Sequence, residues 1–94
     1  MTWTVIYHQD VEEDLLSLGP AMAGRVVRAI DSKLTRAPLD FGLPLSGNLT
    51  DFRKLSVGDC RVVSRVFQEQ VYVLAVGPRR DKEIYRMAGT RKRE

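Results

Sequence analysis

Residues 52–77, FRKLSVGDCRVVSRVFQEQVYVLAVG, carry the clearest structural signal in the chain. They are rich in β-branched residues and are interrupted twice by residues that favour turns. Gly58-Asp59 fits a two-residue hairpin loop, and Gln68-Glu69-Gln70 fits a three-residue one. The stretch therefore predicts three consecutive antiparallel strands, which cover residues 52–57, 60–67 and 71–77.

The first loop determines which side chains share a face of this sheet. It places Val57 opposite Cys60, and side chains then alternate between two faces. The more apolar face should pack on helices, and it carries Arg53, Leu55, Val57, Cys60, Val62, Ser64 and Val66. The other face should be open to solvent, and it carries Phe52, Lys54, Ser56, Arg61, Val63 and Arg65.

The second loop extends this pattern to the third strand. A three-residue loop places Val71, Val73, Ala75 and Gly77 on the open face, and Tyr72, Leu74 and Val76 on the core face. Ala75 and Gly77 then lie opposite Val63 and Arg61. The small residues leave a shallow floor beside Arg61, around which Lys54, Arg61 and Arg79 converge. A slip of one residue in this loop would move Arg79 to the other face.

The first half of the chain predicts a strand followed by a helical hairpin. Residues 3–8 alternate as a short strand with two apolar faces, which indicates an interior position in the sheet. Asp10, with Glu13 three residues later, is typical of a helix N-cap. One helix should end at Gly19-Pro20, and a second should cover residues 20–36. Residues 37–50 follow as an ordered, proline- and glycine-containing loop.

Together these elements predict an α+β fold with the order β-α-α-β-β-β. An antiparallel sheet would pack on a helical hairpin in two layers, with a short C-terminal turn or helix through Tyr85 and Met87. The chain has 94 residues, which is enough for one domain over residues 1–94.

Composition limits the chemistry that is available. His8 and Cys60 are the single histidine and the single cysteine, so we expect no metal and no cofactor. His8 lies in the first strand, where a structural role is expected. No apolar run is long enough for a membrane span and no signal peptide opens the chain, so we expect a cytoplasmic protein.

Charge is distributed unevenly along the chain. Residues 1–50 contain four basic and six acidic residues, whereas residues 51–94 contain eleven basic and six acidic ones. A concentrated positive field favours a polyanion such as nucleic acid, or an acidic protein partner. A solvated basic surface that binds nothing is the remaining alternative.

Three segments resemble the RelE/ParE toxin superfamily. Leu45-Ser46-Gly47 matches its leucine-x-glycine, and residues 52–63 match its aromatic-basic-x-leucine-x-valine-glycine-aspartate hairpin. Residues 76–85 match its valine-glycine-x-arginine segment, with a tyrosine six residues after the arginine. The resemblance covers nearly the whole chain and agrees with the predicted order of elements. It implies the toxin half of a bacterial type II toxin–antitoxin pair, with a cognate antitoxin as partner in a hetero-oligomeric complex.

The resemblance also implies site residues. The RelE branch cuts messenger RNA on the ribosome, and its catalytic positions match Lys54, Arg61, Arg79 and Tyr85. A further lysine of that branch falls at Phe52. The remaining cations expected to bind RNA phosphates are Arg53, Arg65, Arg80, Lys82 and Arg86. The absent lysine favours the alternative of a ParE-like inhibitor of DNA gyrase without nuclease activity. An inactive member that acts only in the antitoxin complex is a third reading.

In the RelE reading, cleavage needs a base for the 2′-hydroxyl and a clamp for the phosphorane. Tyr85 and Lys54 are the candidate bases, because neighbouring cations favour the phenolate and the neutral amine. Arg61 and Arg79 are the candidate clamps, and the guanidinium fork matches two phosphate oxygens. Such a weak set of bases implies that the ribosome positions the RNA.

Overall fold

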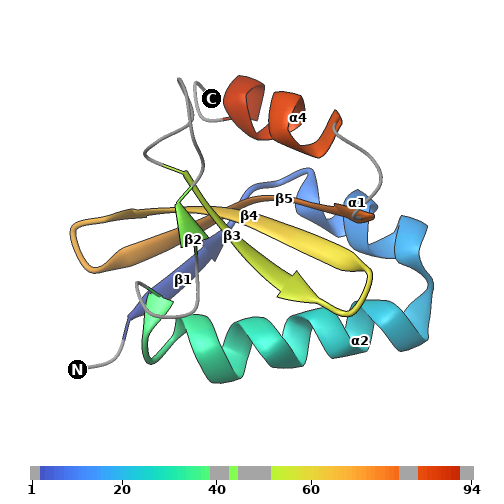
Figure 1. Cartoon of the computed structure of the whole chain (residues 1–94), viewed down its shortest axis with the longest axis horizontal. Helices are drawn as coiled ribbons and strands as arrows, with labels where there is room; N and C mark the ends of the chain where they lie inside the picture. The colour runs from blue at the N-terminus through green and yellow to red at the C-terminus, as the bar shows by residue number, and fades with distance from the viewer. Residues whose placement is uncertain (1–2, 39–42, 45–51, 79–82, 92–94) are drawn as a thin grey trace.

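The computed structural model describes residues 3–38, 43–44, 52–78 and 83–91 (Figure 1). Its elements are β1 (Thr4–Tyr7), α1 (Val11–Leu18), α2 (Pro20–Ala29), the π-helix η1 (Ile30–Leu34), β2 (Leu43–Pro44), β3 (Phe52–Val57), β4 (Cys60–Phe67), β5 (Gln70–Pro78) and α4 (Glu83–Arg91). The predicted α+β class and the succession of one strand, a helical hairpin and three strands are confirmed. The loop expected over residues 37–50 is described only at residues 37–38 and at Leu43–Pro44, and the latter form the short strand β2, which was not predicted.

The strands form one mixed sheet in the order β1-β5-β4-β3-β2. β1 pairs in parallel with β5, from Thr4 opposite Gln70 to Tyr7 opposite Val73, while the other neighbours are antiparallel. The prediction that the first strand is interior was wrong, because β1 is an edge strand whose Ile6 and Tyr7 are exposed. On one face of β1, Val5 packs against the core under the helices, whereas Ile6 on the other face remains partly open to solvent.

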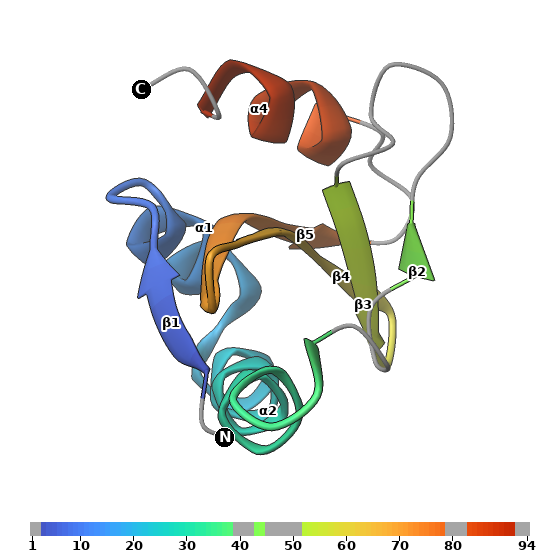
Figure 2. The same ribbon diagram turned by 90° about the vertical axis from the view of Figure 1, so that its left-hand side faces the viewer.

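Helices cover both faces of the sheet (Figure 2). On one face, α1, α2 and η1 bury Val11, Val26, Ile30 and Leu34 against β3, β4 and β5. On the opposite face, α4 buries Ile84 and Ala88 in a second cluster, which also contains Phe52, Val63, Leu74 and Ala75. The fold therefore has a third layer beyond the two that were expected. Burial of Phe52, Val63 and Leu74 accounts for it, since three apolar side chains on one face need a cover.

The boundary between the two N-terminal helices is where the sequence places it. Gly19 follows α1 with a φ of 87°, which glycine adopts at no steric cost, and Pro20 begins α2. Asp10 lies at the predicted N-cap position of α1, but it makes no side-chain capping hydrogen bond. Its φ and ψ of −86° and −4° are helical, whereas a capping carboxylate requires an extended residue. Its backbone N–H instead donates to His8 Nδ1 at 3.1 Å.

The two hairpins differ in how closely they match the prediction. The first has the expected register, with Val57 opposite Cys60 and Lys54 opposite Val63. The second has a two-residue loop, Gln68-Glu69, so Phe67 pairs with Gln70 and Arg65 with Tyr72. The predicted three-residue loop was therefore wrong. Val71 and Val73 accordingly lie in the helical core, and Tyr72 and Leu74 lie on the α4 face.

A bulge cancels the error farther along the strand. Ser64 pairs with Val73 and Val63 with Ala75, so Leu74 is an extra residue in β5. From Ala75 onward the register is the predicted one, with Arg61 opposite Gly77. The loop is one residue shorter than predicted, and the bulge adds one residue to β5, so the two changes cancel in the register.

Candidate functional site

Lys54 and Arg61 lie on the face of the sheet that α4 covers. Lys54 alternates with the buried Phe52 along β3, and Arg61 alternates with the buried Val63 along β4. Both side chains are half-buried. Arg61 Nη1 donates to the carbonyl of Cys60 at 3.2 Å, which leaves other N–H groups of the guanidinium available to a ligand.

The shallow floor predicted beside Arg61 is filled by α4. Ala75 is fully buried in the α4 cluster, and a Cβ on Gly77 would lie 3.5 Å from Ile84 Cδ1. Ile84 of α4 thus packs directly over Gly77 of β5.

The helix α4 carries two of the predicted site residues. Tyr85 is half-buried and packs against the cluster formed with Phe52 and Val63, whereas Arg86 is exposed. Tyr85 thus reaches the same face as Lys54 and Arg61. Its neighbour Ile84 anchors the start of the described helix on β5.

The two remaining described cations lie on opposite faces of the sheet. Arg53 is half-buried on the face that packs on the helical hairpin, as its position in the strand predicts. Arg65 lies on the α4 face, and its guanidinium carbon is 5.8 Å from the centroid of the Phe67 ring. Three other predicted residues, Arg79, Arg80 and Lys82, lie outside the described residues.

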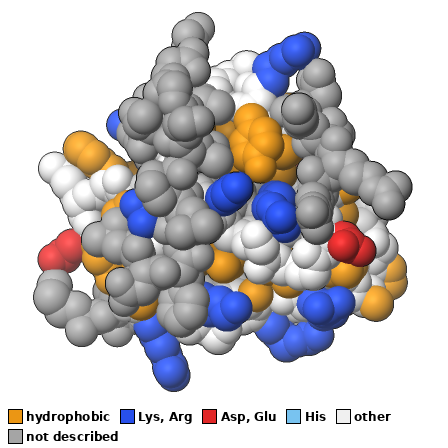
Figure 3. All heavy atoms as spheres, viewed as in Figure 1, with side chains coloured by type: hydrophobic (Ala, Val, Ile, Leu, Met, Phe, Trp, Pro, Cys, Tyr) orange, Lys and Arg blue, Asp and Glu red, His pale blue; other side chains and the backbone are white. Residues whose placement is uncertain are grey.

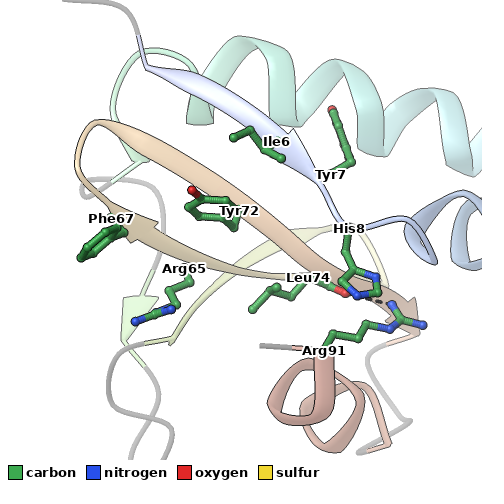
Figure 4. Close-up of a pocket in the computed structure, with 8 residues that line it drawn as sticks. All are labelled: Ile6, Tyr7, His8, Arg65, Phe67, Tyr72, Leu74 and Arg91. Atoms are coloured by element: carbon green, nitrogen blue, oxygen red, sulfur yellow. Dashed lines mark hydrogen bonds between the residues drawn. The ribbon is translucent and has the colours of Figure 1, made fainter. Parts of the chain in front are cut away.

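A hollow of about 330 Å³ lies beside α4 on the same face, and the sequence did not predict it. Figure 4 shows Arg65 and Phe67 at one end, Tyr72 in the middle, and His8 and Arg91 at the other end. Tyr7, which also lines it, is a phenol whose pKa is raised by burial and then by Asp31. No local pattern signals this hollow, because it depends on the parallel pairing of β1 with β5.

Positive charge dominates the coloured part of the surface in Figure 3, where Lys and Arg side chains outnumber Asp and Glu. Within the described ranges, no group of three or more His, Cys, Asp or Glu side chains is arranged to hold a metal ion. Among the helices of that same part of the chain, none has the length and hydropathy to cross a membrane.

Comparison with known families shows the family of this chain. The family model described as the ParE toxin of the type II toxin–antitoxin system parDE matches residues 5–83. A chain of the toxin–antitoxin complex RelBE2 from Mycobacterium tuberculosis is 30% identical, with a TM-score of 0.78, and the match covers 84% of this chain and 100% of that one. This protein belongs to the RelE/ParE superfamily. It is a toxin of the type II toxin–antitoxin class.

Two further solved structures share the fold of this toxin. The RelE–RelB complex of the archaeon Pyrococcus horikoshii is 28% identical with a TM-score of 0.64, covering 85% of this chain and 98% of that chain. A mutant of Escherichia coli toxin RelE in the free state is 20% identical with a TM-score of 0.77, covering 97% and 98%. A search of curated protein sequences finds no significant match to this toxin.

Proposed function

We propose that this toxin is a ribosome-dependent messenger RNA endonuclease of the RelE type. The observation that carries the proposal is the placement of Lys54, Arg61 and Tyr85 on one face of the sheet. Two of them come from neighbouring strands, and the third comes from the helix packed on those strands. Phosphodiester cleavage without a metal needs a general base, a general acid and positive charge near the phosphorane, and a phenol with cations on the same face can supply all three.

The roles follow from the chemistry of each side chain. Tyr85 or Lys54 removes the proton of the 2′-hydroxyl, and the 2′-oxygen attacks the phosphorus. Arg61 stabilises the charge of the pentavalent phosphorane, together with Arg79. The bond from phosphorus to the 5′-oxygen then breaks, the Tyr85–Lys54 pair returns to that oxygen the proton taken from the 2′-hydroxyl, and a 2′,3′-cyclic phosphate remains. The ribosome holds the RNA in the reactive conformation, because correct positioning of the reacting groups supplies a large part of the rate.

The further cations contribute binding and not chemistry. Arg65 on β4 and Arg86 on α4 are proposed to contact RNA phosphates, together with Arg80 and Lys82, which precede α4 in the sequence. Arg53 points to the opposite face of the sheet. It would therefore contact RNA only if the RNA also reached that face. The cellular target places this activity in the cytoplasm, and the partner that controls it is a cognate antitoxin, as in the RelBE complexes.

A second candidate is inhibition of DNA gyrase without cleavage of any nucleic acid. The ParE family match over residues 5–83 favours it. The position of Phe52 also favours it, since the side chain at the position of the RelE branch's first lysine is 1% exposed beneath α4. A lysine at that position could not reach RNA without displacing the helix.

In vitro translation followed by primer extension separates the two candidates. The proposal expects cuts in the message only when programmed ribosomes are present, and expects Tyr85→Phe to remove them. Arg36→Ala changes an exposed cation remote from this face and should cut as the wild type does. Intact message, together with loss of supercoiling when gyrase and plasmid are added, would establish the gyrase candidate. Intact message and unaffected gyrase would leave the reading of a toxin relative that acts only with its antitoxin.

A further inference from the structure

The last described residue of α4, Arg91, joins that helix to two other layers of the fold. Its Nη1 donates to Asp14 Oδ2 at 2.7 Å, and its Nη2 donates to Asp14 Oδ1 at 3.2 Å. The same Nη1 donates to the carbonyl of Leu74 at 2.8 Å. Asp14 belongs to α1 and Leu74 to β5, so the Arg91 side chain links α4 to the helix on the other face of the sheet and to the strand between them. Figure 4 shows Arg91 beside Leu74.

These contacts occupy a stretch of sheet edge that β1 leaves uncovered. β1 pairs with β5 only as far as Val73, and His8 closes the ladder with a hydrogen bond to the Val73 carbonyl. Beyond that point, the Val76 N–H donates to Asp14 Oδ2 at 3.1 Å and the Leu74 carbonyl accepts from Arg91. The ion pair thus satisfies backbone groups that a longer β1 would otherwise bond.

Burial makes this pair unusually sensitive to loss of either partner. The side chains of Arg91 and Asp14 are 11% and 9% exposed. Asp10 adds a second carboxylate, with its Oδ2 at 3.9 Å from Arg91 Nε. Removing one member of a buried pair leaves an uncompensated charge, whereas exposed pairs contribute little.

The helix itself needs such an anchor. α4 has nine residues and includes Gly89, so it is too short and too flexible to be stable without tertiary contacts. Its buried residues are Ile84 and Ala88, which lie in its first six residues. Arg91 anchors the other end.

We propose that the Asp14–Arg91 ion pair is a latch that holds α4 on the sheet and thereby positions Tyr85. Arg91 is a positioning residue and acts through the helix. The catalytic meaning of the latch rests on the proposed endonuclease function, whereas its hold on α4 does not.

Amide hydrogen exchange on the full chain tests the hold on α4 directly. The variants are Arg91→Ala, Arg91→Lys and Asp14→Asn, with Arg28→Ala and Glu13→Gln as exposed controls on α2 and α1. We expect exchange of the amides of residues 87–91 to rise about tenfold or more in Arg91→Ala and Asp14→Asn, with no change in α2. Arg91→Lys keeps the positive charge but not the two parallel hydrogen bonds to the carboxylate. Its exchange rates should therefore lie between those of the other two variants and those of the wild type. The double variant Asp14→Asn/Arg91→Ala should exchange no faster than Arg91→Ala, because both changes open the same contact.

The consequence for Tyr85 is tested by the kinetics of message cleavage. Arg91→Ala should misplace Tyr85 and lower kcat about tenfold, while KM for programmed ribosomes stays within about twofold. Arg91→Lys should recover part of kcat, which a simple loss of folded protein would not produce.

Each outcome bears on the latch. Unchanged exchange in residues 87–91, or an equal rise in α2, would overturn the hold on α4. Faster exchange with unchanged kcat would overturn the positioning of Tyr85. A wild-type toxin that leaves the message intact would overturn the endonuclease proposal and the positioning of Tyr85, while the exchange rates would still decide whether the ion pair holds the helix.

Discussion

Lys54 and Arg61 are diagonal neighbours across the β3–β4 hairpin, because Lys54 pairs with Val63 and Arg61 pairs with Ser56. Diagonal neighbours on one face have Cβ atoms about 7–8 Å apart, which is within reach of two long side chains directed at one phosphate. The hairpin loop therefore fixes a pair of cations without any contribution from the rest of the fold. The helix α4 then adds a phenol to this pair.

Arg61→Ala should lower the rate of message cleavage about 10²–10³-fold, because it removes the main stabilisation of the phosphorane. Arg61→Lys should retain part of the rate, since a point charge replaces the fork. Single-turnover cleavage on programmed ribosomes measures both, with Arg36→Ala as the matched control and thermal melting to verify folding. Full activity of Arg61→Ala would contradict the assigned role.

Phe52→Lys should destabilise the toxin and should not increase cleavage. Phe52 is 1% exposed and packs in the α4 cluster, so a lysine there would bury a charge or displace the helix. Phe52→Ala should cost about 3–5 kcal/mol for comparison. Urea unfolding measures both changes. Leu16→Lys provides the control, because that leucine is 74% exposed and should tolerate the charge. A stable and more active Phe52→Lys protein would show that this site can face RNA.

Replacing Gln68-Glu69 by Asn-Gly should stabilise the toxin by about 1 kcal/mol. Both residues have positive φ, 49° and 65°, which costs energy for residues with an ordinary side chain. Asn-Gly is the preferred pair for a two-residue hairpin loop of this type. A higher urea midpoint with an unchanged slope would confirm the prediction, and the reverse sequence Gly-Asn serves to separate the two positions. A lower midpoint would indicate that one of the original side chains stabilises the loop.

The stability of the toxin should fall in alkaline solution partly through Cys60. Burial, with Asp59, raises the pKa of this thiol above its ordinary value of 9.0, and the nearby Arg25 and Arg61 oppose the rise. Above about pH 9, the unfolded chain releases the thiol proton while the folded chain retains it. The contribution of Cys60 to the free energy of unfolding is therefore complete below about pH 9 and is lost as the pH rises through the pKa of the folded state.

Unfolding free energies from pH 8 to pH 11 measure this effect. Cys60→Ala should show a shallower decline than the wild type. The native thiol should also react slowly with iodoacetamide at pH 8, because it is buried and protonated. Rapid alkylation of the folded protein, or identical declines, would count against this account.

Local pattern was sufficient for much of this fold. Alternation of β-branched residues predicted β3, β4 and most of β5, and Gly58-Asp59 predicted the register that brings Lys54 beside Arg61. Gly19-Pro20 predicted the break between α1 and α2. Each of these signals involves residues a few positions apart, and steric preference and turn geometry act at that range.

Long-range contacts decided the rest. The edge position of β1, the cover of α4 over Phe52, and the ion pair between Asp14 and Arg91 join residues far apart in the chain, 77 positions apart in the last case. The Gln68-Glu69 loop and the Leu74 bulge arise together, because β5 must present Val71 and Val73 to one helical layer and Ala75 to the other. The sequence by itself determined the strands other than β2, the helical hairpin and the pair of cations. Only the tertiary structure decided which apolar face was covered and what held the phenol-bearing helix in place, because those depend on the sum of burial over all layers and not on neighbours along the chain.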